Sequence, residues 1–126
     1  MIFKSINIEV YQDTLKIATG IIVTTPKEDM SCYDRSNPNF ICLEFIGDNS
    51  TFSSHSPNPK FIEKYNYHYS WYVAFYLDRN LPPKEYKQKY VEKIISILRR
   101  DFGNYTFVLR NIRFDEQKNL FSKIKI

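Results

Sequence analysis

The chain has 126 residues, of which 43% are hydrophobic and 25% charged, and its formal net charge is +4. This size and balance are typical of one globular domain, so we expect a single domain over residues 1–126, and its apolar runs are too short to cross a bilayer. Only three glycines occur, which excludes the glycine-rich phosphate loops of P-loop and dinucleotide enzymes, and we expect no cofactor.

The first two segments predict a pair of strands. IFKSINIEVY alternates apolar and polar residues, as a half-buried strand does, and TLKIATGIIVTT repeats the alternation with many β-branched residues. The intervening QD favours a hairpin. The first ten residues lack the apolar block of a secretory signal, so we expect a cytoplasmic protein.

Two polar stretches, residues 26–39 and 47–60, are rich in Pro, Asp, Ser and Asn and predict exposed loops. Between them, FICLEFI is apolar on both faces except for Glu44, which is typical of a central strand in a covered sheet. Cys32 and Cys42 could form a disulfide if they flank a hairpin, although cytosolic thiols stay reduced, and their spacing does not decide the matter. No histidine is spaced to complete a zinc site with them, and we expect no structural metal.

The segment YNYHYSWYVAFYLD, residues 65–78, has an aromatic ring at almost every second position. It predicts a strand from about residue 61 to 77. One parity ends in residues that we assign to the core: Trp71, Val73, Phe75 and Leu77. The other parity carries His68, Tyr72 and Tyr76, which we regard as a presented surface.

The pattern after DRNLPP predicts a helix over about residues 83–102. Pro82 or Pro83 can occupy the first helical turn, and Gly103 with Asn104 supplies the stop. Apolar residues at three-and-four spacing form one buried stripe: Tyr86, Tyr90, Val91, Ile94, Ile95, Leu98 and Phe102. We expect lysines and arginines on the outer face: Lys84, Lys87, Lys89, Lys93, Arg99 and Arg100.

YTFVLRNIRF and LFSKIKI predict two final strands. One helix cannot cover both faces of a parallel sheet, and the short connections suit antiparallel neighbours. The sequence therefore predicts an α+β fold, with a mostly antiparallel sheet of five to six strands and the helix packed on one face. We expect the opposite face to be free for recognition.

Charge is distributed unevenly along the chain. Residues 1–63 contain five Lys and Arg against eight Asp and Glu, whereas residues 64–126 contain thirteen against six. Tyrosines and arginines within a charged rim are what protein interfaces favour. We therefore expect a non-catalytic protein that binds a protein partner, such as an inhibitor or immunity-type protein. Its composition, rich in Lys, Ile, Asn and Tyr, suits an AT-rich bacterial or phage genome.

We assign the binding residues to two places. The sheet face supplies Tyr72, Tyr76 and His68, and the first long loop supplies Tyr33, Asp34 and Arg35. The alternative function is binding of single-stranded nucleic acid or RNA, in which bases would stack on Tyr72 and Tyr76 while Arg110 and Arg113 contact phosphates.

Catalysis is less favoured than binding. His55 and His68 could divide acid and base roles, and Cys32 could be a nucleophile, but no recognisable motif joins them. The acidic residues Glu28, Asp29 and Asp34 lack the alternating ligands of a calcium loop. We therefore predict no catalytic residues and no metal ligands.

Overall fold

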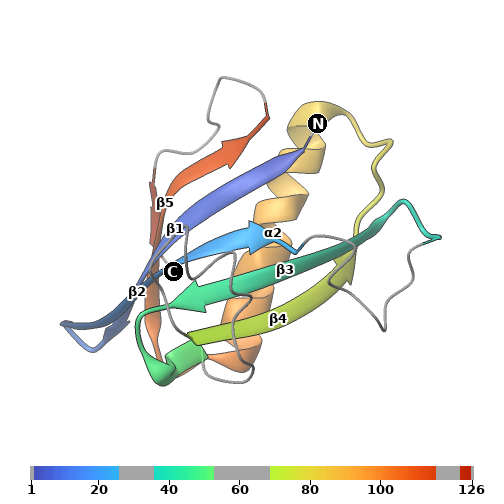
Figure 1. The fold of residues 1–126 in the computed structure, drawn as a ribbon. Helices are drawn as coiled ribbons and strands as arrows, with labels where there is room; N and C mark the ends of the chain where they lie inside the picture. The colour runs from blue at the N-terminus through green and yellow to red at the C-terminus, as the bar shows by residue number, and fades with distance from the viewer. Residues whose placement is uncertain (1, 26–35, 53–68, 116–122, 126) are drawn as a thin grey trace.

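The computed structural model describes residues 2–25, 36–52, 69–115 and 123–125. These residues form one six-stranded sheet and one long helix, in agreement with the predicted α+β fold (Figure 1). In chain order the elements are β1 (Phe3–Gln12), β2 (Leu15–Thr24), β3 (Phe40–Gly47), the 3-10 helix η2 (Ser50–Phe52), β4 (Tyr69–Tyr76), α2 (Pro83–Asp101), β5 (Thr106–Phe114) and β6 (Lys123–Lys125).

The strand order is β4-β3-β2-β1-β5-β6, and every neighbouring pair is antiparallel. The predicted strand over residues 61–77 is described from Tyr69 onward, and its earlier part lies outside the described residues. No helix in the described ranges is both long and apolar enough to span a bilayer.

An irregularity in β5 changes which side chains share a face. Arg110 pairs with Asn7 and Arg113 pairs with Ser5, so β5 uses one residue more than β1 over this stretch. Asn111 takes up the extra residue with a φ of 53°, a left-handed conformation that asparagine tolerates better than most residues. Both arginines therefore lie on the face opposite α2, although their spacing in a regular strand would separate them.

The main core lies between the sheet and α2. Trp71, which we assigned to this core, is only half-buried and packs against it, edge-to-face on Phe45 and Phe102 with ring centroids 5.2 and 5.0 Å apart. The predicted stripe on α2 is confirmed. Four of its residues are buried, namely Tyr90, Val91, Ile94 and Leu98, and three are partly buried against the core, namely Tyr86, Ile95 and Phe102. Ile97 is also buried in this core.

Lys87, which we expected on the outer face of the helix, is instead buried. Only 6% of it is exposed, and its Nζ lies 5.7 Å from the centre of the Phe114 ring. The aliphatic part of a lysine can cover apolar surface while its ammonium group contacts the face of an aromatic ring. The expectation that Lys87 faces solvent was therefore wrong.

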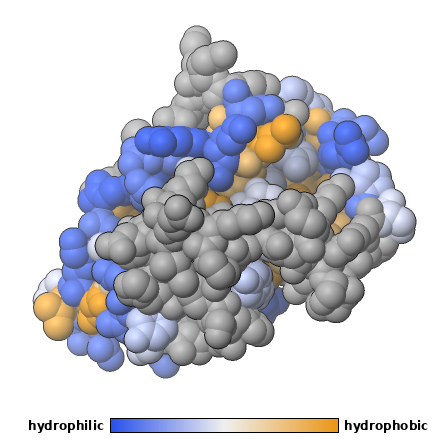
Figure 2. All heavy atoms as spheres, viewed as in Figure 1, coloured by the Kyte–Doolittle hydropathy of each residue, from blue (hydrophilic) through white to orange (hydrophobic). Residues whose placement is uncertain are grey.

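The face opposite α2 is not free throughout, which corrects a second expectation. Ile21, Val23 and Ile46 form a separate buried cluster on this face. Beside it, Cys42, Glu44 and Ser70 are also buried. Figure 2 views this face, and hydrophilic side chains gather over its β1 and β5 side. The exposed side chains of this face therefore lie on its β1 and β5 side and at the Tyr76 end of β4.

Candidate protein-binding surface

Strand β4 lies at one edge of the sheet. Its eight residues pair with β3 without interruption, from Tyr76 opposite Phe40 to Tyr69 opposite Gly47. No strand in the described ranges pairs with its other edge. Natural edge strands usually carry a charge, a proline or a bulge that keeps them from pairing with another chain. Strand β4 has none of these, so it is the edge of this sheet best suited to a partner.

Exposure increases along β4 on the face opposite α2. Ser70 is fully buried, Tyr72 and Ala74 are half-buried, and Tyr76 is 52% exposed. The ring of Tyr76 meets that of Phe40 edge-to-face, with centroids 5.3 Å apart. We call these four accessible residues, Phe40, Tyr72, Ala74 and Tyr76, the β4 surface.

The backbone next to Tyr76 is held firmly by β3 and the residues before it. The N–H of Leu77 donates to the carbonyl of Asn39 at 2.9 Å, and the N–H of Arg79 donates to the side-chain oxygen of Asn39 at 3.0 Å. Because Leu77 is itself buried, Tyr76 is presented from a fixed position. A rigid aromatic anchor loses little conformational entropy when a partner binds it.

The structure brings together only some of the predicted site residues. Tyr72 and Tyr76 lie on the same face of β4, whereas His68, Tyr33, Asp34 and Arg35 lie outside the described residues. Arg110 and Arg113 lie on β5, and β3, β2 and β1 separate them from the tyrosines. Four strand spacings amount to about 19 Å. The tyrosines and arginines therefore do not form one compact site.

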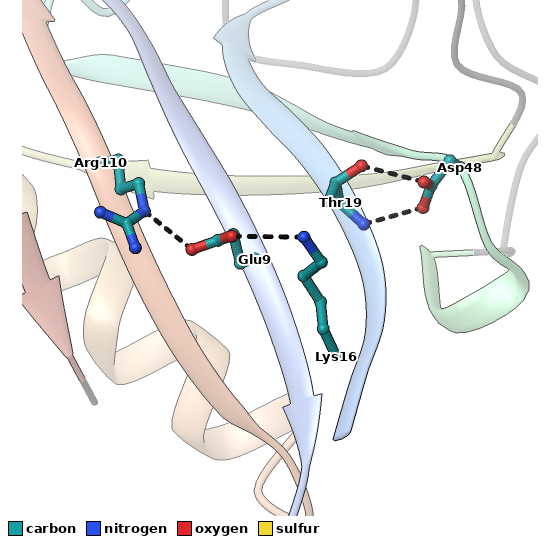
Figure 3. A network of polar contacts seen from close by, with 5 residues as sticks. All are labelled: Glu9, Lys16, Thr19, Asp48 and Arg110. Carbon is teal, nitrogen blue, oxygen red and sulfur yellow. Dashed lines mark hydrogen bonds and ion pairs between the residues drawn. The ribbon is translucent and has the colours of Figure 1, made fainter. Parts of the chain in front are cut away.

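A polar network crosses the β5, β1 and β2 side of the sheet (Figure 3). Arg110 Nε donates to Glu9 Oε1 at 2.8 Å, and Lys16 Nζ lies 3.7 Å from Glu9 Oε2. The hydrogen bond from Arg110 and the charges of Arg110 and Lys16 hold the pKa of Glu9 below its ordinary value. Arg110 is thus engaged within the chain, which reduces what it can offer to a phosphate.

A second polar contact in Figure 3 joins β2 to Asp48, the residue that follows β3. The carboxylate of Asp48 accepts hydrogen bonds from the Thr19 N–H at 2.8 Å and from the Thr19 hydroxyl at 2.9 Å. In return, the Asp48 N–H donates to the Thr19 carbonyl at 3.0 Å. These bonds hold the end of β3 against β2.

We expect Glu9→Gln to lower stability slightly at neutral pH, by less than about 1 kcal/mol, because its partners are partly exposed and solvent screens them. Because the pKa of Glu9 is lower in the folded state than in the unfolded state, its carboxylate stabilises the fold at pH values above the unfolded-state pKa of about 4.3. This stabilisation is lost as the pH falls through the folded-state pKa. Thermal unfolding at several pH values should show the two proteins converging below about pH 4. A difference that widens in acid would contradict this account.

Phe40 is the aromatic member of the β4 surface that sequence reasoning missed. It begins the apolar segment FICLEFI, and its place beside Tyr76 depends on the register between β3 and β4. Alternation along one strand reports which residues share a face but not their cross-strand neighbours.

The described ranges contain no candidate metal site, because no group of three or more His, Cys, Asp and Glu side chains there is placed to hold a metal ion.

Comparison with protein-family models, with curated proteins and with solved structures found no match to this chain.

Proposed function

We propose that this protein is a non-catalytic binding protein that associates stoichiometrically with another protein through the β4 surface. The observation that carries the proposal is the half-exposed ring of Tyr76, held against Phe40 on an uncharged edge strand. Tyrosine is among the residues that contribute most to binding energy at protein interfaces. An edge strand also offers backbone groups to an extended segment of a partner.

The role that we propose is that of an inhibitor or immunity-type protein, which acts by covering a surface of its partner. The excess of basic residues in the second half of the chain favours an acidic partner and would speed their association. Much of this charge is exposed on α2, as Lys84, Lys89, Lys93, Arg99 and Arg100. Because α2 covers the other face of the sheet, these residues would steer the partner rather than contact it at the β4 surface.

Nucleic-acid binding is the less supported alternative. It requires stacking residues and cations along one path for a single strand. Here Arg110 pairs with Glu9, and about 19 Å separates β5 from the tyrosines of β4. The centre of the face between them holds buried residues such as Ile21 and Ile46.

Tyr76→Ala tests the proposal in an affinity capture from the source cells, with the bound proteins identified by mass spectrometry. We expect the variant to lose about 30-fold or more in affinity for the captured partner, because a hot-spot aromatic contributes about 2 kcal/mol. Leu15→Ala is the matched control, because Leu15 is also an exposed apolar residue, at 68%, but lies at the β1–β2 hairpin.

The capture should be repeated after nuclease treatment. A partner that Leu15→Ala retains, Tyr76→Ala loses and nuclease leaves in place would support the proposal. Equal recovery by both variants would contradict it. Recovery that disappears with nuclease would favour the nucleic-acid alternative instead.

A further inference from the structure

The pairing of β3 with β4 determines which backbone groups of β4 point away from the sheet. In an antiparallel pair, opposite residues alternate between those that exchange both of their backbone hydrogen bonds and those that exchange none. The Leu77 N–H donates to the Asn39 carbonyl at 2.9 Å, and these two residues continue the register in which Tyr76 lies opposite Phe40. The odd-numbered residues of β4 therefore bond to β3, and the even-numbered residues direct their N–H and C=O groups outward.

A second hydrogen bond supports this assignment. The Thr25 N–H donates to the Cys42 carbonyl at 2.9 Å, so the backbone groups of Cys42 point toward the β2 side of β3. Ala74 lies opposite Cys42 on β4 and therefore does not exchange backbone bonds with it. Four residues of β4 consequently have outward backbone groups: Ser70, Tyr72, Ala74 and Tyr76.

The outer edge of β4 is open at Ala74 and Tyr76. Ser70 is buried, and both Ser70 and Tyr72 make other contacts within the chain. No strand in the described part of the chain pairs with the outward groups of Ala74 and Tyr76 (Figure 1). Each of these two residues therefore offers one N–H donor and one C=O acceptor at the edge of the sheet.

The chemistry of this edge identifies what can cover it. Alternating N–H and C=O groups with strand spacing are satisfied by another backbone in the same extended conformation, as in recognition by strand addition. We propose that the partner at the β4 surface contributes an extended segment, which pairs with β4 at Ala74 and Tyr76 as an additional antiparallel strand. This inference rests on the proposed function, and it specifies the element of the partner that is bound.

Side chains and charge define the segment further. Tyr72, Ala74 and Tyr76 face away from α2, and the small Ala74 lies between the two rings. An apolar side chain of the segment opposite Ala74 would contact both rings, because diagonal neighbours in a sheet are within reach of aromatic side chains. The net charge of +4 attracts an acidic segment and repels a second copy of the chain. The bound segment is thus acidic, with apolar residues at alternate positions.

Ala74→Pro tests strand addition with the purified partner that Leu15→Ala retains and Tyr76→Ala loses. Proline removes the outward N–H of Ala74 without breaking a bond to β3, and edge strands accept proline at such positions. Ala74→Ser, which keeps the N–H and a small side chain, is the matched control. We expect Ala74→Pro to remain folded and to lose about 10-fold or more in affinity, and Ala74→Ser to bind within about 2-fold of the wild type.

Amide hydrogen exchange followed by NMR examines the same edge without a substitution. In the free protein, the amides of Val73 and Phe75 should exchange slowly because they bond to β3, whereas those of Ala74 and Tyr76 should exchange rapidly. In the complex, exchange at Ala74 and Tyr76 should slow by about 10-fold or more. This measurement decides the inference even if Ala74→Pro proves to be unstable.

Slow exchange at Ala74 and Tyr76 in the free protein, or unchanged exchange there in the complex, would overturn the inference. Full binding by Ala74→Pro with lost binding by Tyr76→Ala would also overturn it, while leaving the proposed function intact. Retention of the partner by Tyr76→Ala, or the absence of a captured partner, would instead contradict the proposed function itself. Sedimentation equilibrium of the chain alone tests the other occupant, since a dimer that Ala74→Pro dissociates would assign the edge to a second copy and overturn the inference.

Discussion

Trp71→Ala is expected to lower the free energy of unfolding by about 3 kcal/mol, because it removes a large ring from a packed site. The indole lies on the α2 side of β4 and bridges Phe45 in the sheet to Phe102 at the end of α2. Its removal would leave a cavity between the sheet and the helix. Urea unfolding followed by far-UV circular dichroism measures the loss.

Tyr76→Ala is the matched control, because it removes a large ring from the other face of the same strand. Tyr76 is 52% exposed, so we expect the free energy of unfolding of this variant to stay within about 0.5 kcal/mol of the wild-type value. Equal destabilisation by the two substitutions would mean that β4 does not divide its aromatic residues between core and surface.

Gly20→Ala is expected to destabilise the protein by about 3 kcal/mol, because the added methyl group has no space. Gly20 lies on β2 opposite Gly47 of β3, and a Cβ there would collide with the carbonyl oxygen of Ile46 and lie 3.2 Å from the Cα of Gly47. These are backbone atoms, so only a separation of β2 from β3 relieves the contact.

The denaturation midpoint of Gly20→Ala should fall well below that of the wild type. Leu15→Ala on the same strand should unfold close to the wild-type midpoint, because Leu15 is exposed. A Gly20→Ala midpoint equal to that of Leu15→Ala would show that the backbones of β2 and β3 lie farther apart at Gly20 than they do in the structure.

The helix was the element that the sequence predicted best. Its expected range of about 83–102 agrees with Pro83–Asp101, because an apolar stripe and its terminal signals are both local patterns. Lys87 was misassigned because its residue type was given more weight than its position. It lies four residues before Val91 and three before Tyr90, and so falls on the buried stripe.

The faces of the sheet were harder to predict, because they depend on contacts between distant segments. The bulge at Asn111 rotates Arg113 onto the face opposite α2, and no local signal in RNIRF gives its position. The sequence did indicate that this face is buried at β3, since FICLEFI carries apolar residues on both parities. Ile46 belongs to that second parity, and it is fully buried in the cluster with Ile21 and Val23.

The candidate site was predicted in part. Alternation along β4 placed Tyr72 and Tyr76 on the face away from Trp71, as the structure has them. Alternation did not reveal that Tyr72 would be half-buried and Tyr76 exposed, nor that Phe40 would lie beside Tyr76.

The most direct test of the account is a calorimetric titration of the captured partner with the wild type and with Tyr76→Ala, at low and moderate salt. We predict a 1:1 complex that Tyr76→Ala weakens about 30-fold or more, with a modest dependence of affinity on salt. An unchanged affinity in Tyr76→Ala, or an affinity that falls by several decades with salt as phosphate binding does, would contradict the assignment of the β4 surface to a protein partner.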